Sequence, residues 1–288
     1  MVIEVYLEHI GLSSIQGKPV DLELLQMIVV AHLSTFTYQN SDLFLQGLLQ
    51  ANLRKPNDIS IESIFKQFIH DKRSGYCFQN IELLAWALEK SGFKLTRHLA
   101  QGINQLREKI DEIAVKDSIY THELIIVELN NESWLVDTGY ANNSLRYPLK
   151  IIVGEQEIAD DKYYLSSDEH KVRLEMVIND EWFCLYDLNR NAKSSAEIFD
   201  AHQTLFTSNQ NIPIRDNFYK LAKVTPNKRK NLCVFSETHS GFFKSHGINY
   251  KKEKEITTIE QFKEIAKKKF DIEINEEISQ PIFSIGLN

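Results

Sequence analysis

The N-terminal third of the chain has the hydrophobic periodicity of helices. Apolar side chains recur mostly at three- and four-residue steps over residues 22–33, a spacing that places them on one face of a helix. A second apolar segment covers residues 61–69, and a third covers residues 77–90 and is followed by Gly92, a residue that often ends a helix. The pattern predicts a helical domain over residues 1–95.

From about residue 96 the hydrophobic period shortens to two, and β-branched and aromatic residues become frequent. This alternation is typical of strands with one buried face. The candidate strands are residues 96–102, 122–129, 134–137, 163–165, 173–178 and 182–188. Short strands this close together favour a barrel or a sandwich, so we predict a β domain over residues 96–192.

The remaining chain, residues 193–288, mixes both patterns. It predicts a helix over residues 195–207, a strand over 231–236 and a helix over about 259–270. The residues between the first helix and Pro226 are interpreted as polar connections. We therefore expect a third domain that contains both helices and strands.

Charge and apolar content exclude several classes of protein. The 288 residues include 33 Lys and Arg against 40 Asp and Glu, a net charge of −7, which argues against nucleic acid as a partner because phosphate binding needs a dense positive face. The N-terminus has no secretory pattern. Its longest nearby apolar run, residues 27–31, is far shorter than the ~20 residues of a membrane helix. We expect a cytoplasmic protein without membrane attachment.

The cysteines and two incomplete motifs narrow the chemistry further. Cys77, Cys184 and Cys233 are odd in number and far apart, which suits neither a disulfide framework nor a metal site. The segment Gly11–Lys18 resembles a phosphate loop but has the wrong spacing and is followed by proline. The pair His122-Glu123 begins like a zinc-protease motif, but the second histidine is missing. We expect no metal site, and any functional cysteine would act without another.

Cys77 lies where a turn meets an amphipathic helix. The residues before it, 72–76, include Gly75 and have no apolar periodicity, whereas residues 81–88 are amphipathic. The thiol would lie on the first helical turn, where unpaired N–H groups and the helix dipole stabilise a thiolate. We expect its pKa to fall below the free value of ~8.5. On this feature alone, a small core residue is the commoner role for such a cysteine.

A predicted hairpin supplies a histidine and a carboxylate. Asn130 and Asn131 separate two strand-like segments, and asparagine tolerates the positive φ of a two-residue turn. Pairing about this turn gives partner numbers that add up to 261, so His122 faces Gly139. Asp137 is then diagonal to His122 on the same face, within side-chain reach. Together with a helix-start cysteine, this pair predicts a Cys–His–Asp relay of nucleophile, base and orienting carboxylate.

These residues resemble the motifs of a known family. The segment Arg73-x-Gly-Tyr-Cys-Phe-x-Asn80 is similar to the active-site cysteine motif of the arylamine N-acetyltransferases, and Val136-Asp-Thr-Gly-Tyr140 is similar to the family's aspartate segment. Residues 32–40, HLSTFTYQN, resemble its segment that ends in Pro-Phe-Glu-Asn. The sequence departs from the family at Ser74 and Ala141, where glycine is common. It also departs at residues 37–39, because neutral Gln39 stands where the acidic partner of Arg73 is expected.

The resemblance implies a fold of class α+β. It has an N-terminal helical bundle carrying Cys77, a central β-barrel carrying His122 and Asp137, and a C-terminal α/β lid. It implies acetyl transfer from the cosubstrate acetyl-CoA to a small-molecule amine (an arylamine, hydrazine or N-hydroxyarylamine) through an acetyl-cysteine, with no metal. The implied substrate-binding residues are Phe78, Tyr140, Tyr38 and Gly139.

The sequence is also compatible with other functions. An amide synthase or acyltransferase of the same fold would use a larger acyl donor, and a papain- or transglutaminase-like enzyme would pass the acyl group to water or lysine. A non-catalytic binding protein would keep the scaffold without the reaction. Between Lys244 and Asp271 there are eight Lys against five Asp and Glu. We interpret this excess as a solvated helix face, and a wall for the phosphates of CoA is the alternative.

Overall fold

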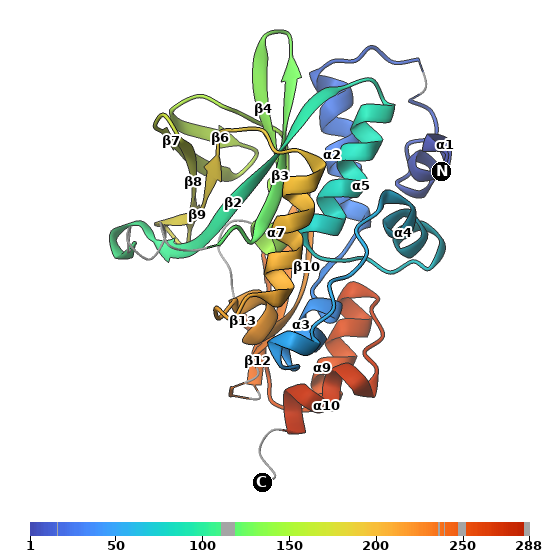
Figure 1. The fold of residues 1–288 in the computed structure, drawn as a ribbon, viewed down its shortest axis with the longest axis vertical. Coiled ribbons are helices and arrows are strands. Elements are labelled where there is room, and N and C mark those ends of the chain that lie inside the picture. The colour runs from blue at the N-terminus through green and yellow to red at the C-terminus, as the bar shows by residue number, and fades with distance from the viewer. Residues whose placement is uncertain (16, 111–118, 236, 239, 247–251, 285–288) are drawn as a thin grey trace.

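The computed structural model describes residues 1–15, 17–110, 119–235, 237–238, 240–246 and 252–284. Its N-terminal part is a bundle of helices (Figure 1). The helices are α1 (Ile3–His9), α2 (Leu22–Thr35), α3 (Ser41–Gly47), α4 (Ile61–Phe65) and α5 (Cys77–Lys90), and α4 continues as a π-helical turn, Lys66–His70. Fully buried side chains such as Leu25, Ile28 and Leu84 form the core between them.

The middle of the chain forms an antiparallel sheet that curls into a nearly closed barrel (Figure 1). Its eight strands follow the spatial order β5-β4-β3-β2-β9-β8-β7-β6. They are β2 (Lys94–Leu106), β3 (His122–Leu129), β4 (Glu132–Val136), β5 (Leu149–Lys150), β6 (Gly154–Ile158), β7 (Asp161–Ser167), β8 (Lys171–Ile178) and β9 (Glu181–Asn189). Helix α5 packs against β3, so the bundle and the sheet share one boundary.

The C-terminal part is a lid of helices and a second antiparallel sheet. The sheet has the order β1-β10-β11-β12-β13, and β1 comes from the N-terminal bundle. Its elements are β1 (Tyr38–Gln39), α7 (Ser195–Thr207), α8 (Pro213–Asp216), β10 (Phe218–Thr225), β11 (Lys228–Phe235), β12 (Ser240–His246), β13 (Lys252–Ile256), α9 (Ile259–Ile265) and α10 (Glu276–Ser284). Apolar residues of α9 and α10 cover one face of this sheet. The α+β fold class is confirmed.

A buried ionic cluster joins the barrel-like sheet to the lid. Asp161 Oδ2 at the start of β7 accepts hydrogen bonds from Arg146 Nε at 2.6 Å and from Arg229 of β11 at 2.5 Å. Arg229 also donates to the main-chain oxygens of Asn142 and Ser144. Burial acts to raise the pKa of Asp161, but Arg229 and Arg146 outweigh it and hold that pKa below its usual value. The carboxylate therefore stays charged and fixes the two sheets together.

The hydrophobic pattern predicts most of these elements, including α2, α5, α7 and β3. It fails for β10, because residues 208–226 were expected to be polar connections. Both faces of β10 are partly covered, so its polar residues interrupt the alternation: Tyr219 and Leu221 face the lid helices, whereas Lys220 lies on the opposite face. Within the described residues, no helix has the length and apolar content needed to cross a membrane.

Candidate active site

The hairpin of β3 and β4 forms as expected. Asn130 and Asn131 have φ of 53° and 62°, the left-handed values of a two-residue turn that matches strand twist. Ile125 pairs with Val136, which is the predicted register. At the open end of the hairpin, His122 Nε2 lies 2.8 Å from Asp137 Oδ2, and both side chains are buried.

Asp137 is itself held in place by the chain that follows it. Its second oxygen, Oδ1, accepts a hydrogen bond from the Gly139 N–H at 2.9 Å. Gly139 in turn lies against the nucleophile candidate, since a Cβ there would be 3.0 Å from Cys77 Cα and 3.2 Å from Cys77 Cβ. A side chain at residue 139 would push helix α5 away from the hairpin. This close contact explains why glycine is needed there.

Cys77 is the first residue of α5, and the turn before it is fixed by hydrogen bonds. Asn80 Nδ2 donates to the main-chain oxygens of Gly75 at 2.7 Å and Tyr76 at 3.0 Å. The Tyr76 hydroxyl lies 2.7 Å from His202 Nε2 of α7. The helix start is therefore anchored both within its own turn and from the linking helix α7.

The environment of the Cys77 thiol differs from the sequence-based expectation. Burial raises its pKa to about 12, and the opposing hydrogen bond from the Phe78 N–H does not compensate. The expectation of a lowered pKa is therefore wrong for the protein without substrate. The helix start does act in the predicted direction, but desolvation of the sulfur has the larger effect. A free thiolate is disfavoured here, so the proton of Cys77 needs a nearby acceptor when the sulfur reacts.

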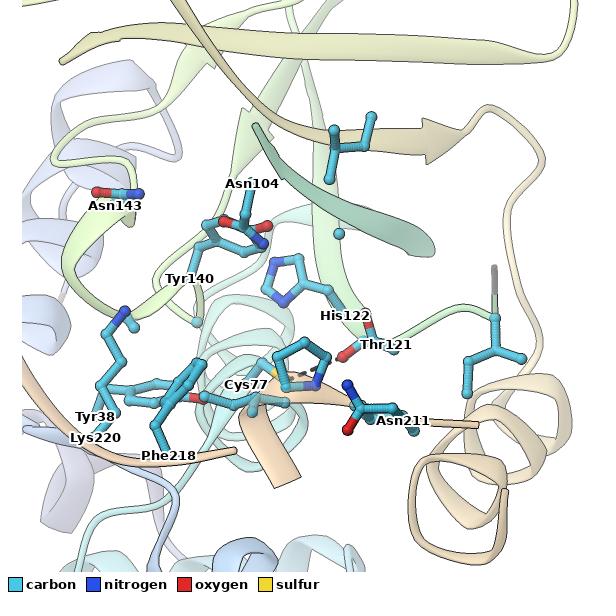
Figure 2. Close-up of a pocket in the computed structure, with 18 of the residues that line it drawn as sticks. Tyr38, Cys77, Asn104, Thr121, His122, Tyr140, Asn143, Asn211, Phe218 and Lys220 are labelled. Atoms are coloured by element: carbon cyan, nitrogen blue, oxygen red, sulfur yellow. Dashed lines mark hydrogen bonds between the residues drawn. The ribbon is translucent and has the colours of Figure 1, made fainter. Parts of the chain in front are cut away.

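Cys77 and His122 line one cavity of about 480 Å³, and Figure 2 shows both side chains facing it. Tyr38, Gly139 and Tyr140 line the same cavity. Phe78 does not, because its ring is fully buried and lies edge-on to His202, with centroids 5.2 Å apart. The expectation that Phe78 lines the pocket is therefore corrected: its main-chain N–H, rather than its ring, acts on Cys77.

Tyr140 fixes the imidazole from the barrel side. Its ring is edge-on to His122 and to Tyr186, with centroids 4.8 and 5.0 Å apart. Its hydroxyl donates to the Leu185 main-chain oxygen at 2.7 Å. A ring held at both ends keeps His122 from rotating away from Asp137.

Comparison with known proteins decides the family. A family model described as N-acetyltransferase matches residues 21–279. Human arylamine N-acetyltransferase 1 is 26% identical over 306 residues, which cover 100% of this chain and 95% of the human one. The chain belongs to the arylamine N-acetyltransferase family.

Other members of the arylamine N-acetyltransferase family agree with this assignment. The Mycolicibacterium smegmatis enzyme is 29% identical over 187 residues, covering 63% of this chain and 62% of the relative. A solved M. smegmatis structure has a TM-score of 0.77 at 22% identity, covering 99% and 98% of the two chains. The Mycobacterium marinum enzyme in complex with CoA has a TM-score of 0.76 at 18% identity, covering 99% of each chain. At these identities the structural likeness shows the fold.

Two of the three departures from the arylamine N-acetyltransferase motifs have structural explanations, and nothing in the structure explains the third, Ala141. Arg73 pairs with Asp42, three residues beyond Gln39, with Nη2 3.0 Å from Oδ1. Ser74, in place of glycine, accepts a hydrogen bond from the Thr37 N–H through its hydroxyl at 3.2 Å. Ala141 has a φ of 52°, which is a left-handed conformation that favours glycine.

Glu123 is a buried acid beside the candidate base. Successive strand residues point to opposite faces, so Glu123 faces away from the cavity that His122 lines. Its carboxyl group is fully buried. Burial, and then the neighbouring Glu82, raise its pKa well above the usual value, although Arg97 opposes this. Burial therefore favours the protonated form of this side chain. Within the described part of the chain, no cluster of three or more His, Cys, Asp or Glu could hold a metal ion.

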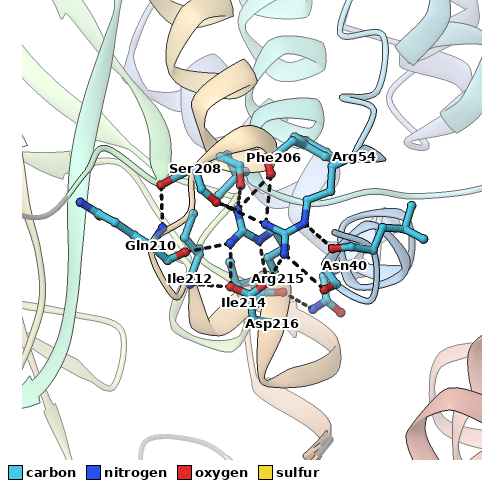
Figure 3. A network of polar contacts seen from close by, with 12 residues as sticks. Asn40, Arg54, Phe206, Ser208, Gln210, Ile212, Ile214, Arg215 and Asp216 are labelled. Atoms are coloured by element: carbon cyan, nitrogen blue, oxygen red, sulfur yellow. Dashed lines mark hydrogen bonds and ion pairs between the residues drawn. The ribbon is translucent and has the colours of Figure 1, made fainter. Parts of the chain in front are cut away.

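The sequence reasoning missed the wall of the pocket opposite Cys77. This wall runs from Gln210 to Ile214 and continues with Phe218 and Lys220 of β10. Figure 3 shows the guanidinium of Arg215 at the centre of the loop that forms it. Arg215 donates to the main-chain oxygens of Leu205, Phe206, Ser208 and Gln210 and pairs with Asp216. The only sequence signal for this wall is an arginine, Arg215, among polar residues, and this pattern is too common to identify a binding site.

The lysine-rich segment lies elsewhere. Lys267 pairs with Asp271 and Glu273, and Lys268 pairs with Glu264. Neither lysine is among the described residues that line the pocket. This placement favours the interpretation as a solvated helix face.

Proposed function

We propose that this protein transfers an acetyl group from acetyl-CoA to an arylamine, hydrazine or N-hydroxyarylamine through an acetyl-Cys77 intermediate. The observation that carries the proposal is the contact of 2.8 Å between His122 Nε2 and Asp137 Oδ2 in a cavity that Cys77 also lines. A nucleophile, a base and an orienting carboxylate are the three groups that such acyl transfer needs.

In the first half-reaction, the sulfur of Cys77 attacks the acetyl carbonyl carbon of the thioester. Because Nε2 of His122 is engaged with Asp137, Nδ1 is the nitrogen that accepts the thiol proton. The C–S bond to CoA then breaks, and His122 returns the proton to the departing thiolate. This coupling of proton transfer to attack suits a thiol whose pKa burial raises to about 12.

In the second half-reaction, the amine nitrogen attacks the acetyl carbon on Cys77. His122 accepts a proton from the amine nitrogen as the new C–N bond forms, and the proton then goes to the departing sulfur of Cys77. Asp137 keeps the imidazole oriented and stabilises its charged form. Main-chain N–H groups at the start of α5, including that of Phe78, are the candidate donors to the carbonyl oxygen in both steps.

The relatives support this reaction over the alternatives. Two of them are named arylamine N-acetyltransferases, and a solved structure of another holds CoA. An amide synthase with a larger donor and a cysteine hydrolase are not favoured.

We also propose domain boundaries near residues 95 and 192 and a cytoplasmic location. The three free cysteines agree with a reducing compartment. The absence of nucleic-acid partners stays a prediction.

Steady-state kinetics test the proposal. Initial rates at varied acetyl-CoA and 4-anisidine should give the parallel double-reciprocal lines of a ping-pong mechanism. Cys77→Ala should abolish turnover, whereas Cys233→Ala, the removal of a buried cysteine outside the pocket, should retain it. Intersecting lines, or turnover by Cys77→Ala, would contradict an acetyl-cysteine intermediate.

A further inference from the structure

The strand that carries His122 also surrounds the sulfur of Cys77. Cys77 Sγ lies 3.7 Å from the main-chain oxygen of Thr121 (Figure 2). The main-chain N–H groups of Phe78 and Glu123 form hydrogen bonds with the same sulfur and act to lower its pKa. Thr121 and Glu123 flank His122 in the sequence. The distance from the sulfur to the imidazole therefore depends on how the start of β3 lies against the start of α5.

A pair of carboxyl groups joins these two elements behind the sulfur. Ile125, two residues beyond Glu123 on β3, packs in the core that α5 shares, so the Glu123 side chain is also on the face toward α5. There it forms a hydrogen bond with the side chain of Glu82. Glu82 belongs to the helix that Cys77 begins, and Glu123 follows His122 on β3. The pair thus links the element of the nucleophile to the element of the base.

A hydrogen bond between two carboxyl groups needs one proton, and Arg97 decides which group keeps it. Arg97 of β2 donates to Glu82 from Nε at 2.8 Å and from Nη2 at 3.3 Å, and to Glu89 from Nη1 at 2.9 Å. The guanidinium therefore supports the charged form of Glu82. Glu123 is fully buried, and burial and then Glu82 raise its pKa. Glu123 thus holds the proton and is the donor of the pair.

We propose that Glu123 is a positioning residue, whose protonated carboxyl group donates to Glu82 and holds the strand of His122 against the helix of Cys77. This proposal rests on the proposed acetyl transfer. A carboxylate at residue 123 would face Glu82 as a like charge in a buried layer, where water screens little. It would also raise the pKa of the Cys77 thiol. The proton on Glu123 removes both effects and leaves a hydrogen bond between β3 and α5.

A conservative and a disruptive variant separate this hydrogen bond from packing. Glu123→Gln keeps a donor for Glu82 and cannot ionise, whereas Glu123→Leu fills a similar volume without a donor. The readout is the single-turnover rate at which p-nitrophenyl acetate acetylates Cys77. Glu123→Leu should lower this rate by about tenfold, the size of one hydrogen bond to a charged group, and Glu123→Gln should restore most of it. An undiminished rate in Glu123→Leu, or an equal loss in Glu123→Gln, would overturn the proposal.

The partner residue gives a second test. Glu82→Leu leaves Arg97 its pair with Glu89 and should slow acetylation as Glu123→Leu does. Combining the two changes should add no further loss, because both remove the same contact. Additive losses would contradict action through the pair.

Glu175→Leu is the matched control. It removes another buried acid, which pairs with Arg107 and lies outside the described lining of the pocket. Its acetylation rate should equal that of the wild type, and urea unfolding should show that every variant is folded under the assay conditions. A tenfold loss in Glu175→Leu would overturn a role specific to Glu123.

Infrared spectroscopy tests the proton itself. The difference spectrum between the wild type and Glu123→Gln at neutral pH should contain the C=O stretching band of a protonated carboxyl group. A merely structural side chain in its ionised form would give no such band. Absence of the band would overturn the assignment of the proton to Glu123.

Alkylation separates this proposal from the proposed function. Iodoacetamide reacts with the Cys77 sulfur and needs no acetyl donor, and mass spectrometry of the Cys77 peptide measures its rate. The rate should fall in Glu123→Leu and recover in Glu123→Gln. If the wild type accepts no acetyl group from acetyl-CoA or p-nitrophenyl acetate, the proposed function fails, whereas alkylation still tests Glu123. Equal alkylation rates in the wild type and Glu123→Leu would overturn the positioning role.

Discussion

The two walls of the pocket are built in different ways. The wall that carries Cys77, His122 and Asp137 comes from one helix start and one hairpin. Some of its positioning contacts join residues close in sequence, such as Asn80 to Gly75 and Asp137 to Gly139, and Tyr76 to His202 is a long-range contact. The loop of the opposite wall is organised locally by Arg215, but Asn40 joins this wall to the helical bundle through side-chain contacts that span 174 to 180 residues. Local contacts therefore orient His122 and Asp137 within the hairpin, whereas the meeting of Cys77 with the hairpin and the placement of the second wall both depend on the assembled fold.

The largest expected effect is at the locally built wall. Asp137→Asn should lower kcat by about 10⁴-fold, because an amide at residue 137 favours the wrong imidazole tautomer. Stopped-flow measurement of the acetylation step would show the loss directly. Asp187→Asn is a matched control, since Asp187 of β9 is a buried carboxylate that pairs with Arg173 and Lys171 of β8. Comparable losses of kcat in both variants would mean that Asp137 is only structural.

A smaller effect is expected at the opposite wall. Arg215→Met removes a buried cation that pairs with Asp216 and hydrogen-bonds the main-chain oxygens of Leu205 and Gln210, and should lower the free energy of unfolding by about 3 kcal/mol. Urea unfolding measures this cost. Arg54→Met, which removes longer bonds to Phe206 and Ser208, should cost about 1 kcal/mol.

Kinetics on the same Arg215→Met protein sharpen the comparison. Its KM for the amine should rise, while acetylation of Cys77 from p-nitrophenyl acetate stays near the wild-type rate. Loss of both half-reactions below the unfolding transition would show that the walls are not independent.

The features that local sequence rules determine could be predicted, and those that depend on the folded chain could not. The turn Asn130-Asn131 fixes its own register, so the meeting of His122 with Asp137 follows from local rules. The pKa of Cys77 does not follow, because desolvation depends on everything packed around the sulfur. Lys220 could not be found either, since no local pattern identifies β10 as a strand, and its contact with Asn40 needs the folded chain.

The buried acid behind the catalytic wall gives a pH-dependent prediction. The pKa of Glu123 is raised in the folded protein, so folding takes up a proton and stability falls as pH rises above the unfolded value of about 4.5. The wild type should lose up to about 1.4 kcal/mol per pH unit from this group. Glu123→Gln should remove that slope, as chemical denaturation at pH 5, 6 and 7 would measure. Glu128→Gln, at an exposed position on the same strand, should leave it unchanged. A slope in Glu123→Gln equal to that of the wild type would contradict a raised pKa of Glu123.

The smallest expected effect concerns Ala141 at the rim of the pocket. Its φ of 52° is strained for alanine, and Ala141→Gly would relieve that strain. Glycine also has more conformational freedom in the unfolded chain, which offsets part of the gain. The net effect should be a rise of about 0.5 to 1 kcal/mol in the free energy of unfolding. Ala159→Gly, with a φ of 53° outside the pocket, should give a similar gain. Thermal unfolding compares them, and a loss of stability at residue 141 would contradict the strain.

The central claim is that Cys77 forms the acetyl intermediate through His122. Intact-protein and peptide mass spectrometry after brief exposure to acetyl-CoA, without amine, test it most directly. We expect one added acetyl group per chain, located on Cys77 and absent from Cys184 and Cys233. Later addition of 4-anisidine should remove it, and its formation should be greatly slowed in His122→Gln. An acetyl group on another residue, or equal acetylation in His122→Gln, would contradict it.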